Sequence, residues 1–362
     1  MQRMRTKTVK VGKIAIGGDS GISVQSMTNA DPHDFQAVLS QIRRLEAAGC
    51  DIVRLTVPDK DAADVLYRIK CAGVETPLVA DVHFDYRAAL YAIEAGADKI
   101  RINPGNIGGE DRVKEVAKAC VSHGIPARVG ANSGSCREDE LKKYGGPTPR
   151  ALCESALAYA RMLKKHGLDD IVISIKSSDT MGTIEANRLL ADTEEYLDDP
   201  YPLHIGITEA GGGERGIIKG AVGIGALLSE GIGDTVRVSL TDDPVNEVYA
   251  AKQILSALGI LEGGYVDIVS CPTCGRTKID VIGAFNELSE FSKTLRPKRK
   301  IKAAVMGCAV NGILEAKEAD VGIAGGDGKA VLFSHGEIIR TIPEADIIPE
   351  MKKYIKELTE NI

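Results

Sequence analysis

Three cysteines near the carboxyl end have the residue type and spacing of metal ligands. Cys271 and Cys274 lie in Ser270-Cys-Pro-Thr-Cys-Gly-Arg-Thr277, and Cys308 follows in Met306-Gly-Cys-Ala-Val-Asn-Gly312. A pair two residues apart binds one metal centre from a single turn, and a third thiolate from a later segment closes around it. On an iron–sulfur cluster, three thiolates leave one position for a weaker protein ligand or a substrate oxygen.

The same pair fits two other kinds of site. Zinc accepts Cys-x-x-Cys with a distant ligand, although structural zinc commonly adds a second close pair or a His, and neither accompanies Cys308. A thioredoxin-like dithiol needs no third cysteine and should open a helix near the start of a βαβ unit. The spacing alone favours an iron–sulfur centre over zinc by a narrow margin.

A second group of candidates consists of basic side chains, each within an otherwise apolar or β-branched run. A buried charge at such a position is costly unless an anion accompanies it. Guanidinium groups bind phosphate oxygens bidentately and Lys adds a point charge, so together they can hold a substrate with two phosphates. The alternative is a network of Arg–Asp pairs involving Asp81 and Asp242. The basic residues are Arg54, His83, Arg101, Arg128, Lys176 and Arg237.

Three further polar residues stand at the ends of similar runs. Glu209, in Gly206-Ile-Thr-Glu-Ala-Gly-Gly-Gly213, can give or take a proton or can pair with a neighbouring Arg. Asn132 can bind a substrate hydroxyl or shape its turn. Ser239 can bind phosphate or face the barrel wall.

These residues are placed by short strand-like runs that alternate with amphipathic helical stretches. Eight such units predict a (β/α)₈ barrel, in which the chemistry lies at the carboxyl ends of the strands. An open doubly wound sheet is the runner-up, but the Gly-x-Gly-x-x-Gly turn it should carry is missing after the first run. The runs are Ser23–Thr28, Ile52–Val57, Pro77–His83, Lys99–Pro104, Ala127–Asn132, Ile171–Lys176, Leu203–Glu209 and Thr235–Leu240.

The pattern changes near Glu262 and predicts two domains. Residues 1–262 form the barrel, with an alternating hairpin at Val9–Gly18 that plugs its bottom. Residues 263–362 form a smaller α+β domain that carries all three cysteines. It reads as strand, Cys turn, helix (Ile279–Lys293), strand (Lys300–Val305), Cys turn, hairpin around Gly325-Gly-Asp-Gly328 and a final helix from about Pro343.

Composition narrows the class of protein. The chain has 362 residues, of which 44% are hydrophobic, and a net charge of −6, so no overall basic field attracts nucleic acid or anionic lipid. We find neither a signal peptide nor a membrane-spanning run, which predicts a cytosolic protein with its cysteines as thiols or metal ligands. Cys50, Cys71, Cys120 and Cys153 are expected to be buried and inert, and Cys136 to lie on an exposed loop.

Several strings of residues occur in an order that resembles one family from about residue 8 to 330, the 4-hydroxy-3-methylbut-2-enyl diphosphate synthases of the methylerythritol phosphate isoprenoid pathway. The strings are Asp51-Ile-Val-Arg-Leu-Thr-Val57, Lys99-Ile-Arg-Ile-Asn-Pro-Gly-Asn106, Arg128-Val-Gly-Ala-Asn-Ser-Gly134, Gly206-Ile-Thr-Glu-Ala-Gly211, Thr235-Val-Arg-Val-Ser-Leu240, Ser270-Cys-Pro-Thr-Cys274 and Gly307-Cys-Ala-Val-Asn-Gly312. The length is similar to that of the two-domain bacterial form.

The resemblance implies a barrel joined to a [4Fe–4S] domain, a flavodoxin or ferredoxin as electron donor, and a head-to-tail homodimer. The reaction is the two-electron reductive opening of 2-C-methyl-D-erythritol 2,4-cyclodiphosphate to the allylic diphosphate. Cys271, Cys274, Cys308 and Glu315 are implied as cluster ligands, and Glu209 and Asn132 as residues facing the reacting carbons. The implied diphosphate-binding residues are Arg54, His83, Arg101, Arg128, Lys176, Arg237 and Ser239.

One segment departs from the bacterial family. Members commonly read Asn-Gly-Pro-Gly-Glu after the third cysteine, whereas this chain has Asn311-Gly-Ile-Leu-Glu315. Loss of the rigid Pro and the permissive Gly predicts a more helical loop, in which Glu315 takes a different place. A second hypothesis from another class is a phosphosugar-binding barrel whose small domain holds structural zinc and performs no redox step.

Overall fold

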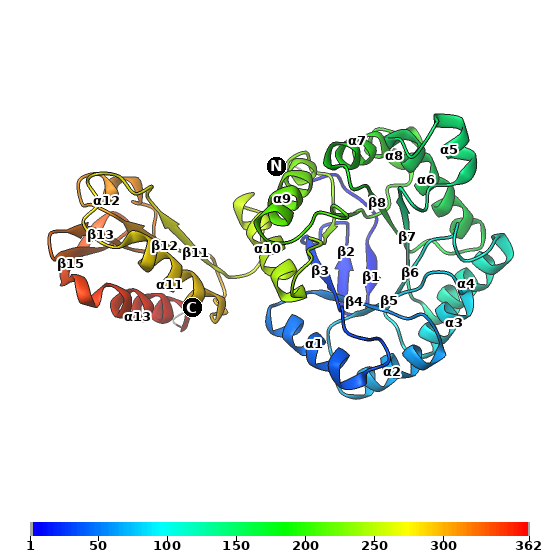
Figure 1. The fold of residues 1–362 in the computed structure, drawn as a ribbon, viewed down its shortest axis with the longest axis horizontal. Helices are drawn as coiled ribbons and strands as arrows, with labels where there is room; N and C mark the ends of the chain where they lie inside the picture. The colour runs from blue at the N-terminus through cyan, green and yellow to red at the C-terminus, as the bar shows by residue number, and fades with distance from the viewer. Residues whose placement is uncertain (1–2, 361–362) are drawn as a thin grey trace. The chain divides into compact units, whose positions relative to one another are not determined.

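The computed structural model describes residues 3–360, and its internal contacts divide the chain into two units, Met1–Leu261 and Glu262–Ile362. The first unit is a (β/α)₈ barrel, which confirms the predicted fold class (Figure 1). Its parallel strands pair in the order β8-β7-β6-β5-β4-β3-β10-β9, and a bridge between Ile173 and Leu203 closes the ring. The strands are β3 (Ser23–Met27), β4 (Ile52–Thr56), β5 (Leu78–Asp81), β6 (Lys99–Ile102), β7 (Ala127–Asn132), β8 (Ile171–Lys176), β9 (His204–Ile205) and β10 (Thr235–Val236).

Amphipathic helices surround this ring (Figure 1). In α1, Val38, Ile42 and Leu45 recur every three or four residues and form the buried stripe that packs on the sheet. Asp34 caps this helix by accepting a hydrogen bond from the Ala37 N–H. The barrel helices are α1 (Phe35–Ala47), α2 (Lys60–Cys71), α3 (Tyr86–Glu94), α4 (Glu110–His123), α5 (Glu138–Tyr144), α6 (Pro149–Lys165), α7 (Thr180–Ala191), α8 (Glu194–Asp198), α9 (Gly213–Ser229) and α10 (Pro244–Ala257). Within residues 3–360 no helix is both long and apolar enough to cross a bilayer.

The hairpin of β1 (Val9–Val11) and β2 (Ile14–Ile16) closes one end of the barrel, as the alternating pattern predicts. Val11 and Ile16 of the hairpin pack on Ile52 and Val79, which lie near the amino-terminal ends of their strands. This apolar layer seals the barrel bottom. The carboxyl ends of the strands are left for polar side chains.

The last two barrel strands are shorter than the runs that predict them. A Cβ atom on Gly206 would lie 2.3 Å from the Arg237 carbonyl oxygen, so the chain after β9 approaches the chain after β10 too closely for a side chain. Glu209 then adopts a left-handed backbone with φ of 55°. A non-glycine residue in this conformation is strained, and such strain is concentrated at functional sites.

The second unit is a five-stranded sheet with helices. Its strands β11 (Val266–Ser270), β12 (Ile301–Met306) and β13 (Val321–Gly326) are parallel, and β14 (Lys329–Ser334) and β15 (Glu337–Pro343) continue the sheet antiparallel. Helices α11 (Val281–Lys293) and α13 (Ile347–Glu360) bury Leu288, Met351 and Ile355 in its core. The sequence pattern missed β15, and the final helix begins at Ile347, after the short turn Glu344–Asp346.

Two expectations about the other cysteines are wrong. Cys71 is exposed because it is the last residue of α2, where the buried stripe of the helix has ended. Cys136 is buried because its loop packs on α6, where its Sγ lies 3.2 Å from the Ser155 hydroxyl. Cys50, Cys120 and Cys153 are buried as expected.

Candidate active site

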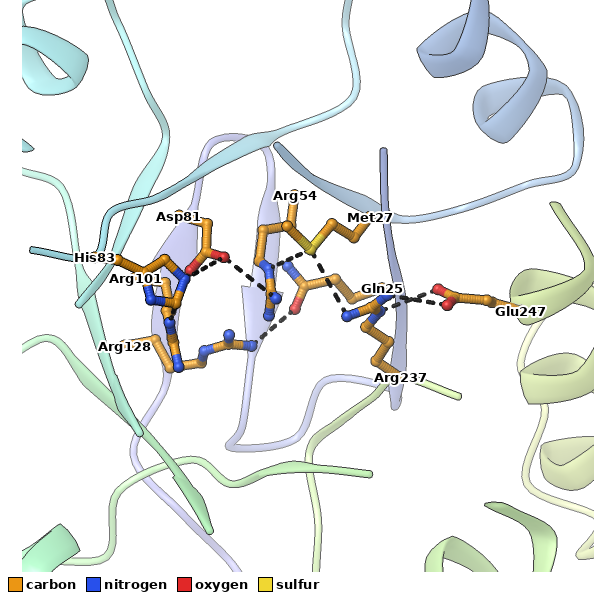
Figure 2. Close-up of polar contacts among 9 residues, drawn as sticks. All are labelled: Gln25, Met27, Arg54, Asp81, His83, Arg101, Arg128, Arg237 and Glu247. Atoms are coloured by element: carbon orange, nitrogen blue, oxygen red, sulfur yellow. Dashed lines mark hydrogen bonds and ion pairs between the residues drawn. The ribbon is translucent and has the colours of Figure 1, made fainter. Parts of the chain in front are cut away.

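A buried carboxylate organises the basic side chains inside the barrel. Asp81, at the end of β5, lies 3.1 Å from Arg101, 3.3 Å from Arg54 and 3.2 Å from the His83 ring (Figure 2). Arg54 and Arg101 come from the strands on either side of β5. The sequence alternative of Arg–Asp pairing is therefore correct for Asp81, and three of the candidate residues converge on one carboxylate.

Electrostatics keep this carboxylate charged. Burial alone would raise the pKa of Asp81, but the charge of Arg54, the His83 hydrogen bond and the charge of Arg101 together hold it well below its usual value. Burial lowers the pKa of Arg54 to about 10, which leaves the guanidinium protonated at neutral pH. The result is a fixed ion network with net positive charge.

A second carboxylate holds Arg237, and the sequence analysis missed it. Glu247 of α10 is 3% exposed and accepts two hydrogen bonds from Arg237, at 3.0 and 2.9 Å (Figure 2). It accepts a further hydrogen bond from the Ser26 hydroxyl at 2.8 Å. Asp242, which was expected to take part in such pairs, is exposed and accepts a bond from the next backbone N–H instead. The sequence did contain a signal for this contact, because Glu247 lies on the buried face of α10, one residue before Val248.

Two of the predicted diphosphate-binding residues have no carboxylate partner among residues 3–360. Arg128 is 2% exposed and donates to the Gln25 side-chain oxygen at 3.3 Å, while its Nε has no partner (Figure 2). Lys176 is 8% exposed, and its Nζ would lie 2.9 Å from a Cβ on Gly206. Burial lowers the pKa of both side chains, and neighbouring cations lower it further. This unbalanced positive charge is what an anionic ligand would neutralise.

The remaining barrel candidates lie at a strand end or on the loops that follow the strands. Asn132 uses its side-chain oxygen to accept hydrogen bonds from the Gly134 N–H and the Ser135 hydroxyl, so it does shape its turn. Ser239 is half-buried, Glu209 is exposed, and His83 retains 42% of its side-chain exposure. These groups are accessible to a ligand at the strand ends.

In the second unit, the two cysteine loops follow neighbouring parallel strands. Ser270, which ends β11, is paired with Val305 of β12, so both loops leave the same edge of the sheet. Two hydrogen bonds connect the loops. The Gly307 N–H donates to the Cys271 Sγ at 3.1 Å, and the Lys278 N–H donates to the Gly307 carbonyl at 2.8 Å.

Arg276 lies among the other candidate ligands. Its backbone N–H and its guanidinium lower the pKa of Cys274, which favours the thiolate that binds metals. The hydrogen bond to Cys274 raises the pKa of Arg276 most, and the charges of Cys308 and Glu315 raise it further. Glu315 ends the short helix α12 (Gly312–Glu315), in agreement with the helical loop predicted from the loss of Pro and Gly.

In the part of the chain that the structure describes, no three His, Cys, Asp or Glu side chains are grouped closely enough to hold one metal ion. Structural zinc requires four ligands around one centre. Thiolates of an iron–sulfur cluster bind different iron atoms and therefore need not meet at one point.

Comparison with known proteins identifies the family. A model described as the GcpE TIM-barrel domain matches residues 6–252, and one described as the GcpE protein C-terminal domain matches residues 267–357. The chain belongs to the GcpE family. A relative from Caldanaerobacter subterraneus subsp. tengcongensis is 53% identical over 98% of both chains, and one from Ruminiclostridium cellulolyticum is 53% identical over 99% of both. Both are named 4-hydroxy-3-methylbut-2-en-1-yl diphosphate synthase (flavodoxin), which confirms the resemblance found in the sequence.

Solved structures add a likeness in fold. A type I 3-dehydroquinate dehydratase from Clostridium difficile covers 70% of this chain and 98% of its own, with a TM-score of 0.50 and 13% identity. At this identity the likeness concerns the barrel architecture alone. The GcpE family membership carries the argument about chemistry.

Proposed function

We propose that this protein opens and reduces 2-C-methyl-D-erythritol 2,4-cyclodiphosphate to 4-hydroxy-3-methylbut-2-enyl diphosphate in isoprenoid biosynthesis. The relatives' names and near full-length identity support this assignment. The observation in the molecule that carries it is the unpaired charge of Arg128 and Lys176 inside the barrel. Two buried cations without carboxylates suit a ligand that brings two phosphate charges.

The diphosphate is bound by residues on separate strands. Arg128 and Lys176 neutralise it directly, and Arg54, Arg101 and Arg237 are held in position by Asp81 and Glu247. His83 and Ser239 complete the set from the loops. Because the guanidinium groups are already fixed by carboxylates, binding costs little side-chain ordering. The carbon skeleton is thereby oriented at the strand ends, where Glu209 and Asn132 face it.

The second unit carries a [4Fe–4S] cluster held by Cys271, Cys274 and Cys308, with Glu315 as a displaceable fourth ligand. Three observations support the fit: both cysteine loops leave one sheet edge, the Gly307 N–H donates to the Cys271 Sγ, and Arg276 favours the Cys274 thiolate. When bound, such a cluster supplies electrons one at a time and a Lewis-acidic iron. The zinc alternative is not favoured, because the relatives are named as a flavodoxin-dependent reductive synthase.

The reaction consumes two electrons and, with both phosphates counted as free acids, two protons. One carbon–oxygen bond to the cyclic diphosphate breaks, one hydroxyl leaves as water, and a carbon–carbon double bond forms. Glu209 donates the proton that lets the hydroxyl depart as water. Its left-handed backbone lies on the loop that follows β9, where the carboxyl group is exposed.

A flavodoxin is the proposed electron donor, because the relatives' names specify it. We also propose that the protein acts in the cytoplasm as a head-to-tail homodimer in which two chains complete each site. Large apolar side chains are exposed beside both candidate regions: Phe84 next to His83, and Val310 and Leu314 near Cys308. Analytical ultracentrifugation tests this directly, with a monomer at micromolar concentration as the contradicting result.

The assay of the proposal is anaerobic turnover of the cyclic diphosphate by iron-loaded protein with reduced flavodoxin. We expect the allylic diphosphate and water, with two electrons consumed per product. Binding of the cyclic diphosphate without any reductive product would instead favour a phosphosugar-binding barrel.

A further inference from the structure

The basic groups inside the barrel differ in their hydrogen-bond partners. Arg54, Arg101 and Arg237 have carboxylates within hydrogen-bond distance. Lys99 and His204 are 0% exposed, and neither the Lys99 Nζ nor either ring nitrogen of His204 has a hydrogen-bond partner within the described residues. The diphosphate-binding set described above does not include them.

Lys99 lies directly beneath that set. It is on the same face of β6 as Arg101 and two residues earlier, which places its Cα roughly 6.6 Å deeper along the strand. On β5, Arg101 is paired with Asp81 whereas Lys99 is paired with the apolar Val79. The Asp81 carboxylate, two residues along β5 from Val79, is already bonded to Arg54 and Arg101.

The charged groups that face Lys99 are all basic. Arg128 of β7 and Arg54 of β4 act on it, and His204 of β9 responds to the charges of Lys176, Arg128 and Lys99. Burial lowers the pKa of Lys99 well below its usual value, and Arg128 and Arg54 lower it further. On β3, the uncharged Ser23 and Gln25 also have buried polar atoms without hydrogen-bond partners.

We propose that Lys99 is a conditional anion-binding residue, uncharged in the ligand-free barrel and protonated at its Nζ when a ligand with two phosphate charges binds above it. This inference rests on the proposed diphosphate site. Two negative charges at this site offset the repulsion from Arg54 and Arg128, and Coulomb energies in a poorly solvated interior act over this distance. The proton comes from solvent. A ligand with a single negative charge favours protonation of Lys99 less than a ligand with two. Lys99 thus contributes to selecting doubly charged ligands.

Calorimetric titration in buffers of different ionisation enthalpy measures the protons taken up on binding. The first probe is dimethyl diphosphate with one methyl on each phosphate, because neither it nor the cyclic diphosphate titrates near neutrality. For wild-type protein we expect uptake of up to one proton through Lys99, so that affinity measured between pH 9 and 7 rises as the pH is lowered, by at most about tenfold per pH unit. An affinity that is flat across this range would overturn the proposal.

Lys99→Met keeps the length of the side chain and removes the amine. We expect this variant to take up about one proton fewer than wild type and to melt at the same or a higher temperature, because an unpartnered buried amine is replaced by an apolar group. Lys114→Met, at an exposed position on α4, is the matched control and should behave as wild type. Equal proton uptake by Lys99→Met and wild type would refute the role of Lys99.

Carbon NMR of wild-type protein with labelled lysine Cε atoms reports the charge of each lysine directly. This measurement does not depend on whether a variant folds. We expect a resonance at the neutral position that moves to the charged position when dimethyl diphosphate is added, and that is missing in Lys99→Met. Lysines that are all charged before ligand addition would contradict the proposal. If the protein takes up a proton with dimethyl diphosphate but does not bind the cyclic diphosphate, only the proposed function is rejected. If it turns over the cyclic diphosphate but shows no proton uptake that depends on Lys99, only this inference is rejected.

Discussion

The barrel interior and the thiol loops are built in opposite ways. In the barrel, Asp81 and Glu247 fix three arginines before any ligand arrives, and these groups are largely buried. In the second unit, Cys274 and Glu315 are exposed, and no single-ion site forms within residues 3–360. The difference shows that ion pairs can pre-organise a charge-binding site before its ligand arrives. If the proposed cluster is bound by the cysteine loops, its binding energy would instead order them.

Cys271→Ser should have the largest effect and should separate the two regions. We expect loss of the iron–sulfur absorbance and of turnover, because a hydroxyl replaces a thiolate ligand, while binding of the cyclic diphosphate to the barrel persists. Absorption spectra and calorimetry on the same preparation measure both. Cys71→Ser, at an exposed cysteine on α2, is the control and should keep both properties.

Asp81→Asn tests whether ion pairs pre-organise the barrel. Removing this carboxylate leaves Arg54 and Arg101 buried without an anion, which should destabilise the ligand-free protein by about 3–5 kcal/mol. Added cyclic diphosphate should recover part of the loss by supplying negative charge. Thermal unfolding with and without ligand measures the change, and an unaltered melting temperature would contradict the pre-organised network.

The same carboxylate gives a pH dependence. Since its pKa in the folded protein is held below the unfolded value, its contribution to stability is complete above about pH 5 and is lost as pH falls through the acid range. The Asp81→Asn variant should therefore show a weaker decline in stability below about pH 4 than wild type. Acid unfolding curves of the two proteins that remain parallel would remove Asp81 from this role.

Glu209→Gln is expected to keep the cluster and ligand binding but to reduce turnover by about 10²–10⁴-fold, the usual contribution of a general acid. Wild-type turnover would exclude the acid role.

Glu209→Gly should be equally slow yet more stable by roughly 1 kcal/mol, because it removes a side chain from a left-handed backbone. A variant of lower stability would mean that the Glu209 side chain itself stabilises the fold.

The sequence predicted the barrel well because its evidence was local. Each strand run alternates with an amphipathic stripe such as Val38, Ile42 and Leu45, and both periods can be read directly from the chain. The pairing of Asp81 was anticipated, but Glu247 was not, because its contact with Arg237 depends on how α10 packs on the strands. The length of β9 also depends on a contact across strands, at Gly206, that no local pattern contains.

The most direct test of the central claim is the metal and sulfide content of anaerobically purified protein. The account predicts a brown protein with about four irons and matching sulfide per chain, which is lost in Cys271→Ser. A colourless wild-type protein that holds one zinc per chain and still binds the cyclic diphosphate would contradict it.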